Sequence, residues 1–153
     1  MNEEIISKVV GRDVPISTKH SIEIADFIRY KNLQKAKKQL QLTIKEEIAI
    51  PLKRFHKDRG HRKGEKMGPG FYPKKAAKHI LELLNGLEAN SKYKGMNTDL
   101  LFISKIVANK AAARWHMGRN RGRMRSTNIE IFAKEAKEKS KAKKSEKKEE
   151  KKW

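Results

Sequence analysis

The sequence contains no cysteine, which excludes a disulfide-bonded scaffold and any metal site with thiolate ligands. No apolar run approaches the roughly 20 residues that a membrane-spanning helix needs. The first ten residues, MNEEIISKVV, lack the pattern of a secretory signal. Aromatic residues make up only 7% of the 153 residues, so any hydrophobic core is small. We therefore expect one soluble, intracellular domain with no membrane partner.

The motifs of common enzymes and metal proteins are also missing. There is no Gly-Lys-Ser/Thr loop for nucleotide phosphates and no Gly-x-Ser-x-Gly turn for a nucleophilic serine. Among the histidines, only His56 and His61 have the spacing of zinc ligands, and no second pair accompanies them. The sequence thus predicts no catalytic residue, no metal, no cofactor and no small-molecule substrate.

Positive charge is what the chain has in excess. Its 38 lysines and arginines exceed its 18 acidic residues by 20. Residues 53–75, 110–125 and 134–153 carry +18 of this net charge, while the segments between them are nearly neutral. Such self-repulsion disfavours a compact state unless a polyanion neutralises it, and nucleic acid is the obvious candidate.

Apolar periodicity places the first elements between the basic segments. A β-branched run at residues 5–10 predicts a short strand that ends at Gly11. Ser17 is a suitable N-cap for a helix over residues 18–30. Asn32 can cap a second helix through Leu40 whose lysines face water, namely Lys35, Lys37 and Lys38. The pattern Thr43-Ile-Lys-Glu46 is typical of a capping box and predicts a further helical turn.

The second half predicts the clearest helix and an extended hairpin. Residues 56–70 contain four glycines and a proline, which favours a loop. An apolar stripe then predicts a helix from Pro73, as its first residue, to about Tyr93. Strands at residues 100–108 and 127–133 flank a basic connection. The fold class is α+β, in one domain over residues 1–133 with a hairpin at about 100–133. Residues 134–153 form a Lys/Glu-rich tail that is too polar to fold alone.

The connection between the two strands is the strongest candidate for contact with RNA. The arginine guanidinium binds phosphates through bidentate hydrogen bonds and stacks on bases, and planar rings offer stacking faces for unpaired bases. The alternative is a solvated basic loop with no defined target, but the flanking strands and the absence of any acid favour RNA. The candidate residues are Lys110, Arg114, Trp115, His116, Arg119, Arg121, Arg123 and Arg125.

The basic loop before the long helix has a similar character. Its rings, at His56, His61 and Phe71-Tyr72, predict further stacking surfaces. Lys74 and Lys75 fall in the first helical turn, where the helix dipole disfavours cations but favours a phosphate. The remaining candidate RNA contacts in the loop are Arg54, Lys57, Arg59, Arg62 and Lys63. A mobile surface loop is the alternative.

Taken together, the segments resemble a known family: the universal large-subunit ribosomal protein numbered twenty-two in bacteria and seventeen in eukaryotes. The segments that carry this resemblance, in order, are Pro15-Ile-Ser17, Tyr72-Pro-Lys-Lys-Ala-Ala77, Leu87-Glu-Ala-Asn-Ser91, Lys94-Gly95, Val107-Ala-Asn-Lys-Ala111, Gly118-Arg-Asn-Arg-Gly-Arg123 and Ile129-Glu-Ile131. It covers roughly residues 8–133. The loop at residues 53–70 is similar to an insertion in the archaeal and eukaryotic members.

The resemblance implies a structural protein of the cytoplasmic ribosome, with helices packed on a small antiparallel sheet. Its partners would be large-subunit ribosomal RNA, neighbouring ribosomal proteins and the nascent polypeptide, because the hairpin would line the peptide exit tunnel. The tip would lie at about residues 112–117. Between Arg123 and Ile129 the chain is several residues shorter than the family pattern, so we expect a shorter or bulged returning arm. A free-standing general nucleic-acid binder is the alternative function.

Overall fold

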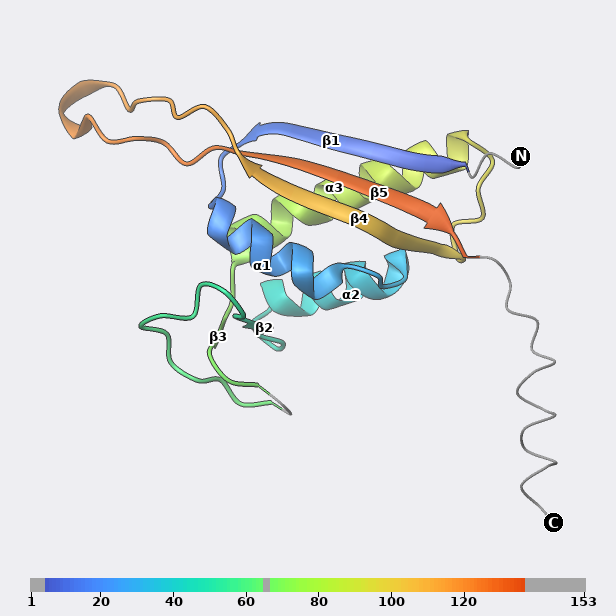
Figure 1. Ribbon diagram of the computed structural model, residues 1–153, viewed down its shortest axis with the longest axis horizontal. Coiled ribbons are helices and arrows are strands. Elements are labelled where there is room, and N and C mark those ends of the chain that lie inside the picture. Colours follow the sequence, from blue (N-terminus) through green and yellow to red (C-terminus); the bar gives the residue numbers. More distant parts are fainter. Residues whose placement is uncertain (1–4, 65–66, 137–153) are drawn as a thin grey trace, which may run out of the picture.

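The computed structural model describes residues 5–64 and 67–136 and has three helices on one face of an antiparallel sheet (Figure 1). The predicted α+β class is therefore confirmed. The elements are β1 (Ile6–Val14), α1 (Thr18–Ile28), α2 (Leu33–Ile44), β2 (Ile50–Pro51), β3 (Gly70–Phe71), α3 (Lys74–Tyr93), β4 (Leu101–Lys110) and β5 (Thr127–Glu135), with a short 3₁₀ turn at Gly118–Asn120.

The three long strands form one sheet in the order β1-β5-β4, and both pairings are antiparallel. Side chains alternate between the two faces of a strand. On β5, Ile129, Ile131 and Ala133 are fully buried, whereas the residues between them are partly exposed. One face of the sheet thus forms one side of the hydrophobic core. The central strand of the sheet is β5, which comes last in sequence among the described strands.

The helices pack on that face of the sheet through the apolar stripes that the sequence predicted. Ile80, Leu84 and Leu87 of α3 are fully buried, and α3 packs on β1 and α2. Ile24 and Ile28 of α1 are also fully buried, and α1 packs on β4. Burial of each such side chain contributes about 1.5–3 kcal/mol, so these contacts dominate the stability of the core.

The first strand is longer than predicted, because Gly11 does not end it. Gly11 pairs with Ile129 within the β1–β5 ladder, next to a register shift between Gly11 and Val14. A Cβ atom at Gly11 would lie 2.9 Å from Leu83 Cδ1, so helix α3 approaches the strand where a side chain is missing. The glycine therefore serves close helix–sheet packing and not a turn.

The prediction that Lys37 faces water was wrong. Its side chain is only 11% exposed and forms an ion pair with Glu88 of α3. Lys92 binds the same carboxylate at 3.1 Å. These two lysine partners lower the pKa of Glu88, more than burial of the carboxyl raises it. Helical spacing located Lys37 beside the apolar stripe, but only the α2–α3 packing gave it a partner.

The predicted helix caps had mixed outcomes. Asn32 caps α2 as expected, because its Oδ1 accepts a hydrogen bond from Gln34 N at 2.9 Å. Ser17 is the N-cap residue of α1, but its side chain makes no capping bond. The capping box at Thr43 was wrong, since Thr43 lies in the last turn of α2, which ends at Ile44, and the Thr43 hydroxyl donates to Gln39 O. Pro73 is the N-cap of α3, one position before its first helical residue.

Side chains of α3 cover the open edge of the sheet at β1. Asn90 Nδ2 donates to Lys8 O at 3.0 Å, and Lys94 Nζ donates to Ile6 O at 2.7 Å. These contacts use carbonyl groups that an exposed edge strand would offer to another chain. The Leu87–Ser91 and Lys94-Gly95 segments therefore protect the sheet edge.

Strand β5 includes the first two residues of the expected tail, and the next residue, Ala136, donates its N–H to Leu100 O at 2.9 Å. The rest of the predicted tail, residues 137–153, lies outside the described residues. Within residues 5–64 and 67–136, no helix is long and apolar enough to cross a membrane.

Candidate nucleic-acid interface

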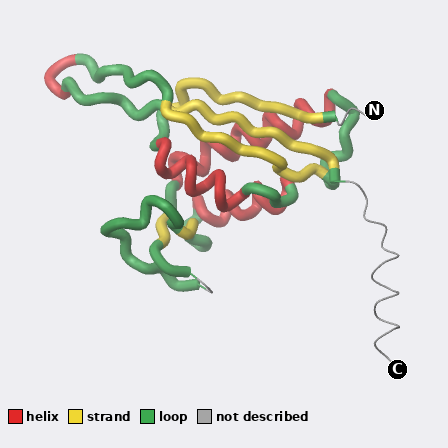
Figure 2. Tube along the Cα trace, in the orientation of Figure 1, coloured by secondary structure: helices red, strands yellow, loops and turns green. Residues whose placement is uncertain are grey.

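The connection between β4 and β5 is a paired hairpin that projects beyond the sheet (Figure 2). Its two arms are joined by a Trp115–Arg123 bridge. Three backbone hydrogen bonds hold the arms at 2.7–3.2 Å, from Ala111 N to Ser126 O, from Met124 N to Arg114 O and from His116 N to Gly122 O. The predicted extended hairpin is thus present, with pairing well past the ends of the two strands.

The two arms differ in length by one residue near the root. Between the Ala111–Ser126 and Arg114–Met124 bonds, the outgoing arm has residues 112 and 113, whereas the returning arm has only Arg125. This difference puts a bulge in the outgoing arm. The expected tip at 112–117 was wrong, because the chain reverses later, around the turn at Gly118–Asn120.

The predicted cations of the hairpin are accessible. All eight candidate residues, from Lys110 to Arg125, are exposed. Arg114 forms an ion pair with Asp13 at 3.5 Å. The Arg123 guanidinium lies 4.9 Å from the centre of the Trp115 ring, so this cation and this stacking face lie together.

Asp13, which the sequence analysis did not single out, ties the hairpin root to the end of β1. Its backbone N–H donates to Asn128 Oδ1 at 2.9 Å, and its carboxylate accepts from Ser126 Oγ at 3.2 Å. The same carboxylate holds Arg114 of the outgoing arm. Asp13 has φ +50°, a left-handed conformation that aspartate tolerates better than most residues. Both arms are therefore anchored to one side chain of the domain body.

Glu23 of α1 anchors the basic loop, and the sequence analysis missed it. The residue is 1% exposed, and its carboxylate accepts backbone hydrogen bonds from Lys53 N (3.0 Å), Arg54 N (2.8 Å) and Phe55 N (2.8 Å). Burial raises the pKa of Glu23, but these hydrogen bonds outweigh it and the pKa is lowered. One signal existed, since Glu23 interrupts the apolar face of its helix, next to Ile24.

The cations of the loop are exposed like those of the hairpin. Arg54, Lys57, Arg59, Arg62 and Lys63 all lie on the surface, as do Lys74 and Lys75 in the first turn of α3. Two of them have acidic neighbours: Lys74 pairs with Glu46 at 2.9 Å, and Arg54 lies 4.0 Å from Asp26.

Phe71 was wrongly predicted as a stacking surface for bases. It is buried, 8% exposed, and its ring packs against His20 of α1 with 4.4 Å between the ring centres. The Arg59 guanidinium lies 5.7 Å from the centre of the same ring. Phe71 therefore holds the end of the loop against α1 and positions Arg59.

His20 of α1 lies near both the basic loop and the hairpin. The pKa of His20 is lowered, first by burial and then by the positive charges of Arg125 and Arg59. One of these arginines belongs to the returning arm and the other to the loop. Two arginines that are more than 60 residues apart in the sequence thus both lower the pKa of one imidazole.

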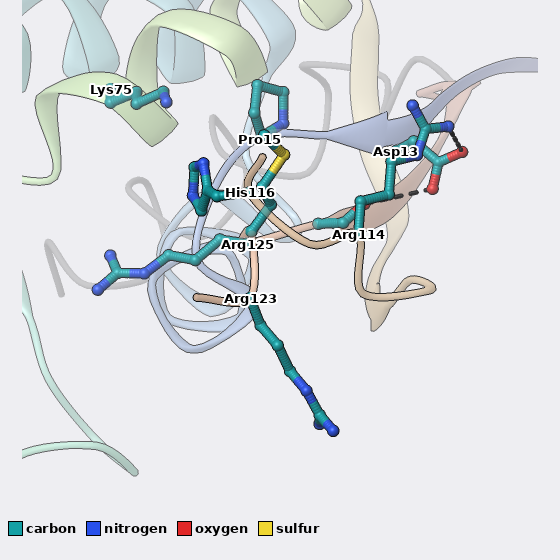
Figure 3. Close-up of a pocket in the computed structure, with 9 residues that line it drawn as sticks. Asp13, Pro15, Lys75, Arg114, His116, Arg123 and Arg125 are labelled. Atoms are coloured by element: carbon teal, nitrogen blue, oxygen red, sulfur yellow. Dashed lines mark hydrogen bonds and ion pairs between the residues drawn. The ribbon is translucent and has the colours of Figure 1, made fainter. Parts of the chain in front are cut away.

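A cleft of about 440 Å³ lies between the hairpin and the start of α3 (Figure 3). In the close-up, Lys75 lies across from His116 and Arg125, whereas Arg114 turns to Asp13 and Arg123 points away from the cleft. Its lining is Asp13, Pro15, Lys75, Arg114, His116, Arg123, Met124, Arg125 and Ser126. Lys75 and the hairpin candidates Arg114, His116, Arg123 and Arg125 are therefore parts of one basic surface.

This arrangement defines a class of protein. In residues 5–64 and 67–136 there is no group of three or more His, Asp or Glu residues that could hold a metal ion. The exposed groups are instead cations on a projecting hairpin and on a loop that is fixed to the domain body. Such geometry suits a small basic domain that presents a rigid surface to a polyanion.

Comparison with known proteins gives the family. The model of the family "Ribosomal protein L22p/L17e" matches residues 9–132. The chain belongs to this family, whose members are structural components of the cytoplasmic ribosome and not enzymes. The predicted family is thus confirmed, and the archaeal relatives agree with the prediction of an archaeal or eukaryotic-type member.

Relatives from archaea show how much of the chain the similarity covers. "Large ribosomal subunit protein uL22" of Nanoarchaeum equitans is 39% identical over 143 residues, covering 88% of this chain and 82% of that protein. The protein of the same name from Ignicoccus hospitalis is 38% identical over 145 residues, covering 88% and 91%. The one from Archaeoglobus fulgidus is 43% identical over 110 residues, covering 71% of each.

Proposed function

We propose that the chain is a structural constituent of the large ribosomal subunit that binds large-subunit ribosomal RNA and supports assembly. The observation that carries this proposal is the hairpin, whose paired arms bear six cations and no acidic residue over residues 110–125. Membership of the L22p/L17e family and the names of the archaeal relatives support the same role.

The proposed RNA contacts are the exposed residues of two segments. Cations that stand on a paired hairpin lose less conformational freedom on binding than cations on a disordered loop, so each phosphate contact costs less entropy. The contacts in the hairpin are Lys110, Arg114, Trp115, His116, Arg119, Arg121, Arg123 and Arg125, and those in the loop and α3 are Arg54, Lys57, Arg59, Arg62, Lys63, Lys74 and Lys75.

We further propose that the hairpin lines the peptide exit tunnel and meets the nascent polypeptide, while the domain body contacts neighbouring ribosomal proteins. The support is its shape: the turn at Gly118–Asn120 is far from the sheet in Figure 1, so the hairpin can reach into RNA that the body does not enter. The unit that docks would be residues 1–133, with residues 134–153 as an appended tail.

The test is ultraviolet crosslinking in cells, followed by sequencing of the attached RNA and identification of the attached peptides. We expect crosslinks concentrated in large-subunit ribosomal RNA, with peptides from residues 110–125 near the tunnel. Crosslinks spread over messenger RNA or DNA would contradict the proposal and would indicate a general nucleic-acid binder.

A further inference from the structure

The hairpin, the basic loop and α3 lie together in one region of the surface. RNA binding at this shared region rests on the proposed function but goes beyond contacts that each segment makes separately. The cleft beside α3 has Lys75, His116 and Arg125 on its walls. Its one carboxylate, Asp13, is engaged by Arg114 and Ser126. The cleft therefore keeps a net positive charge from Lys75 and Arg125 that no described acidic group pairs with.

The positive surface continues from the cleft to the basic loop. The ring centres of His20 and Phe71 are 4.4 Å apart, the Arg59 guanidinium lies 5.7 Å from the centre of the Phe71 ring, and the positive charges of Arg125 and Arg59 both lower the pKa of His20. A second hollow, of about 340 Å³, borders the other side of the returning arm and includes Lys19, the residue before His20. Lys19 and His20 thus lie between the basic surface of the hairpin and that of the loop, two segments that are far apart in the sequence.

We propose that one continuous RNA segment crosses this junction, with a backbone phosphate bound between Lys75, His116 and Arg125 and the strand passing His20 to reach Arg59. The cations at the junction repel one another in the free protein, and a single polyanion along them removes that repulsion at several residues together.

The residues of the junction suit the parts of an RNA strand. Lysine and arginine bind the phosphate through charge-assisted hydrogen bonds. A histidine that remains neutral has one donor and one acceptor, which match a ribose 2′-hydroxyl. Lowering of the pKa of His20 by burial, Arg125 and Arg59 favours that neutral form. The carboxylates of an acidic protein segment only accept hydrogen bonds, whereas every ribose of an RNA strand has a hydroxyl that both donates and accepts, so RNA is the better fit.

The first experiment measures the salt dependence of binding between the full chain and large-subunit ribosomal RNA. Lys75→Ala, Arg125→Ala and Arg59→Ala are each compared with Lys78→Ala, an exposed lysine one turn further along α3 that does not line the cleft. Each junction variant should reduce the slope of log K against log salt by about 1, and Lys78→Ala should leave it unchanged.

The outcomes separate this inference from the proposed function. If the wild-type chain does not bind the RNA, the proposed function fails together with the inference. If the wild-type chain binds but the junction variants keep its slope, the junction fails alone. Equal loss of slope in Lys78→Ala would also overturn the inference, because the effect would then reflect total charge and not the site.

The second experiment asks whether one strand meets both segments. The chain has no cysteine, so a single thiol can carry an iron–EDTA group that cleaves nearby RNA. Ala113→Cys reports from the exposed outgoing arm, and Gly60→Cys from the loop, where a Cβ meets nothing within 4 Å. We expect both to cleave one contiguous stretch of ribosomal RNA. Cleavage in two stretches that do not overlap would overturn the proposal.

Discussion

Replacement of Glu23 by glutamine should loosen the basic loop and destabilise the whole domain. The carboxylate accepts from Arg54 N and Phe55 N through Oε1 and from Lys53 N through Oε2. Glutamine offers one acceptor oxygen, so a partly buried N–H loses its acceptor, at about 1–3 kcal/mol. The other two bonds lose their charged acceptor, which roughly halves their strength. We expect Glu23→Gln to lower the free energy of unfolding by about 3 kcal/mol.

Two measurements check this value on the full chain. Urea unfolding should give the loss of free energy, and thermal unfolding should show a Tm lower by about 10 °C for a domain of this size. Hydrogen exchange should accelerate most at the amides of residues 53–55, which lose their acceptor. Glu47→Gln is the matched control, since Glu47 is exposed and should cost less than about 0.5 kcal/mol.

The cost of Glu23→Gln should also depend on pH. The pKa of Glu23 in the folded state is lowered from its ordinary value of 4.5, so its contribution is fully present above that value. This contribution is lost as the pH falls through the lowered pKa, because the unfolded state then binds the proton first. The difference between wild type and Glu23→Gln should therefore shrink in acid. A cost below 1 kcal/mol at neutral pH, or one that is constant into acid, would refute the reasoning.

Three further changes should have separable effects. Alanine at Arg119, Arg121 and Arg123 together should weaken incorporation into large subunits while circular dichroism stays near native, and normal incorporation would contradict the hairpin's role. Lys37→Ala should cost about 2 kcal/mol in urea unfolding, because it leaves its partly buried glutamate partner on α3 with only one cation; a loss no larger than that of Lys38→Ala would refute this. Asn32→Ala should cost about 1 kcal/mol by the same assay through loss of its cap, and an unchanged midpoint would count against it.

Local sequence signals predicted the elements well where one physical cause dominates. The stripe of α3 and the β alternation around Ile131 were correct, because burial of one face leaves a clear period in the sequence. Signals with two causes misled: Gly11 is typical of a turn or of close packing, and Thr43 of a cap or of a bond back to its own helix. Nothing local separates the alternatives at either position.

The candidate site was predictable as residue types but not as a surface. The excess of cations in residues 53–75 and 110–125 needs no structure to be noticed, and every candidate cation there proved to be exposed. Glu23 was missed because burying a carboxylate costs free energy unless hydrogen-bond partners compensate, so the sequence did not indicate that this residue is buried. Its partners are backbone amides about 30 residues away, and composition carries no record of them.

The sequence by itself determined that the chain is a basic α+β protein with a projecting hairpin and a charge that demands a polyanion. Charge and apolar periodicity are properties of the residues along the chain, so they can be recognised without the tertiary structure. Only the tertiary structure decided that Lys75 of α3 and Arg125 of the hairpin line one cleft, and that Arg59 of the loop and His20 of α1 both pack against the Phe71 ring. Packing between segments distant in sequence creates that proximity, and with it the junction at which we expect a single RNA strand.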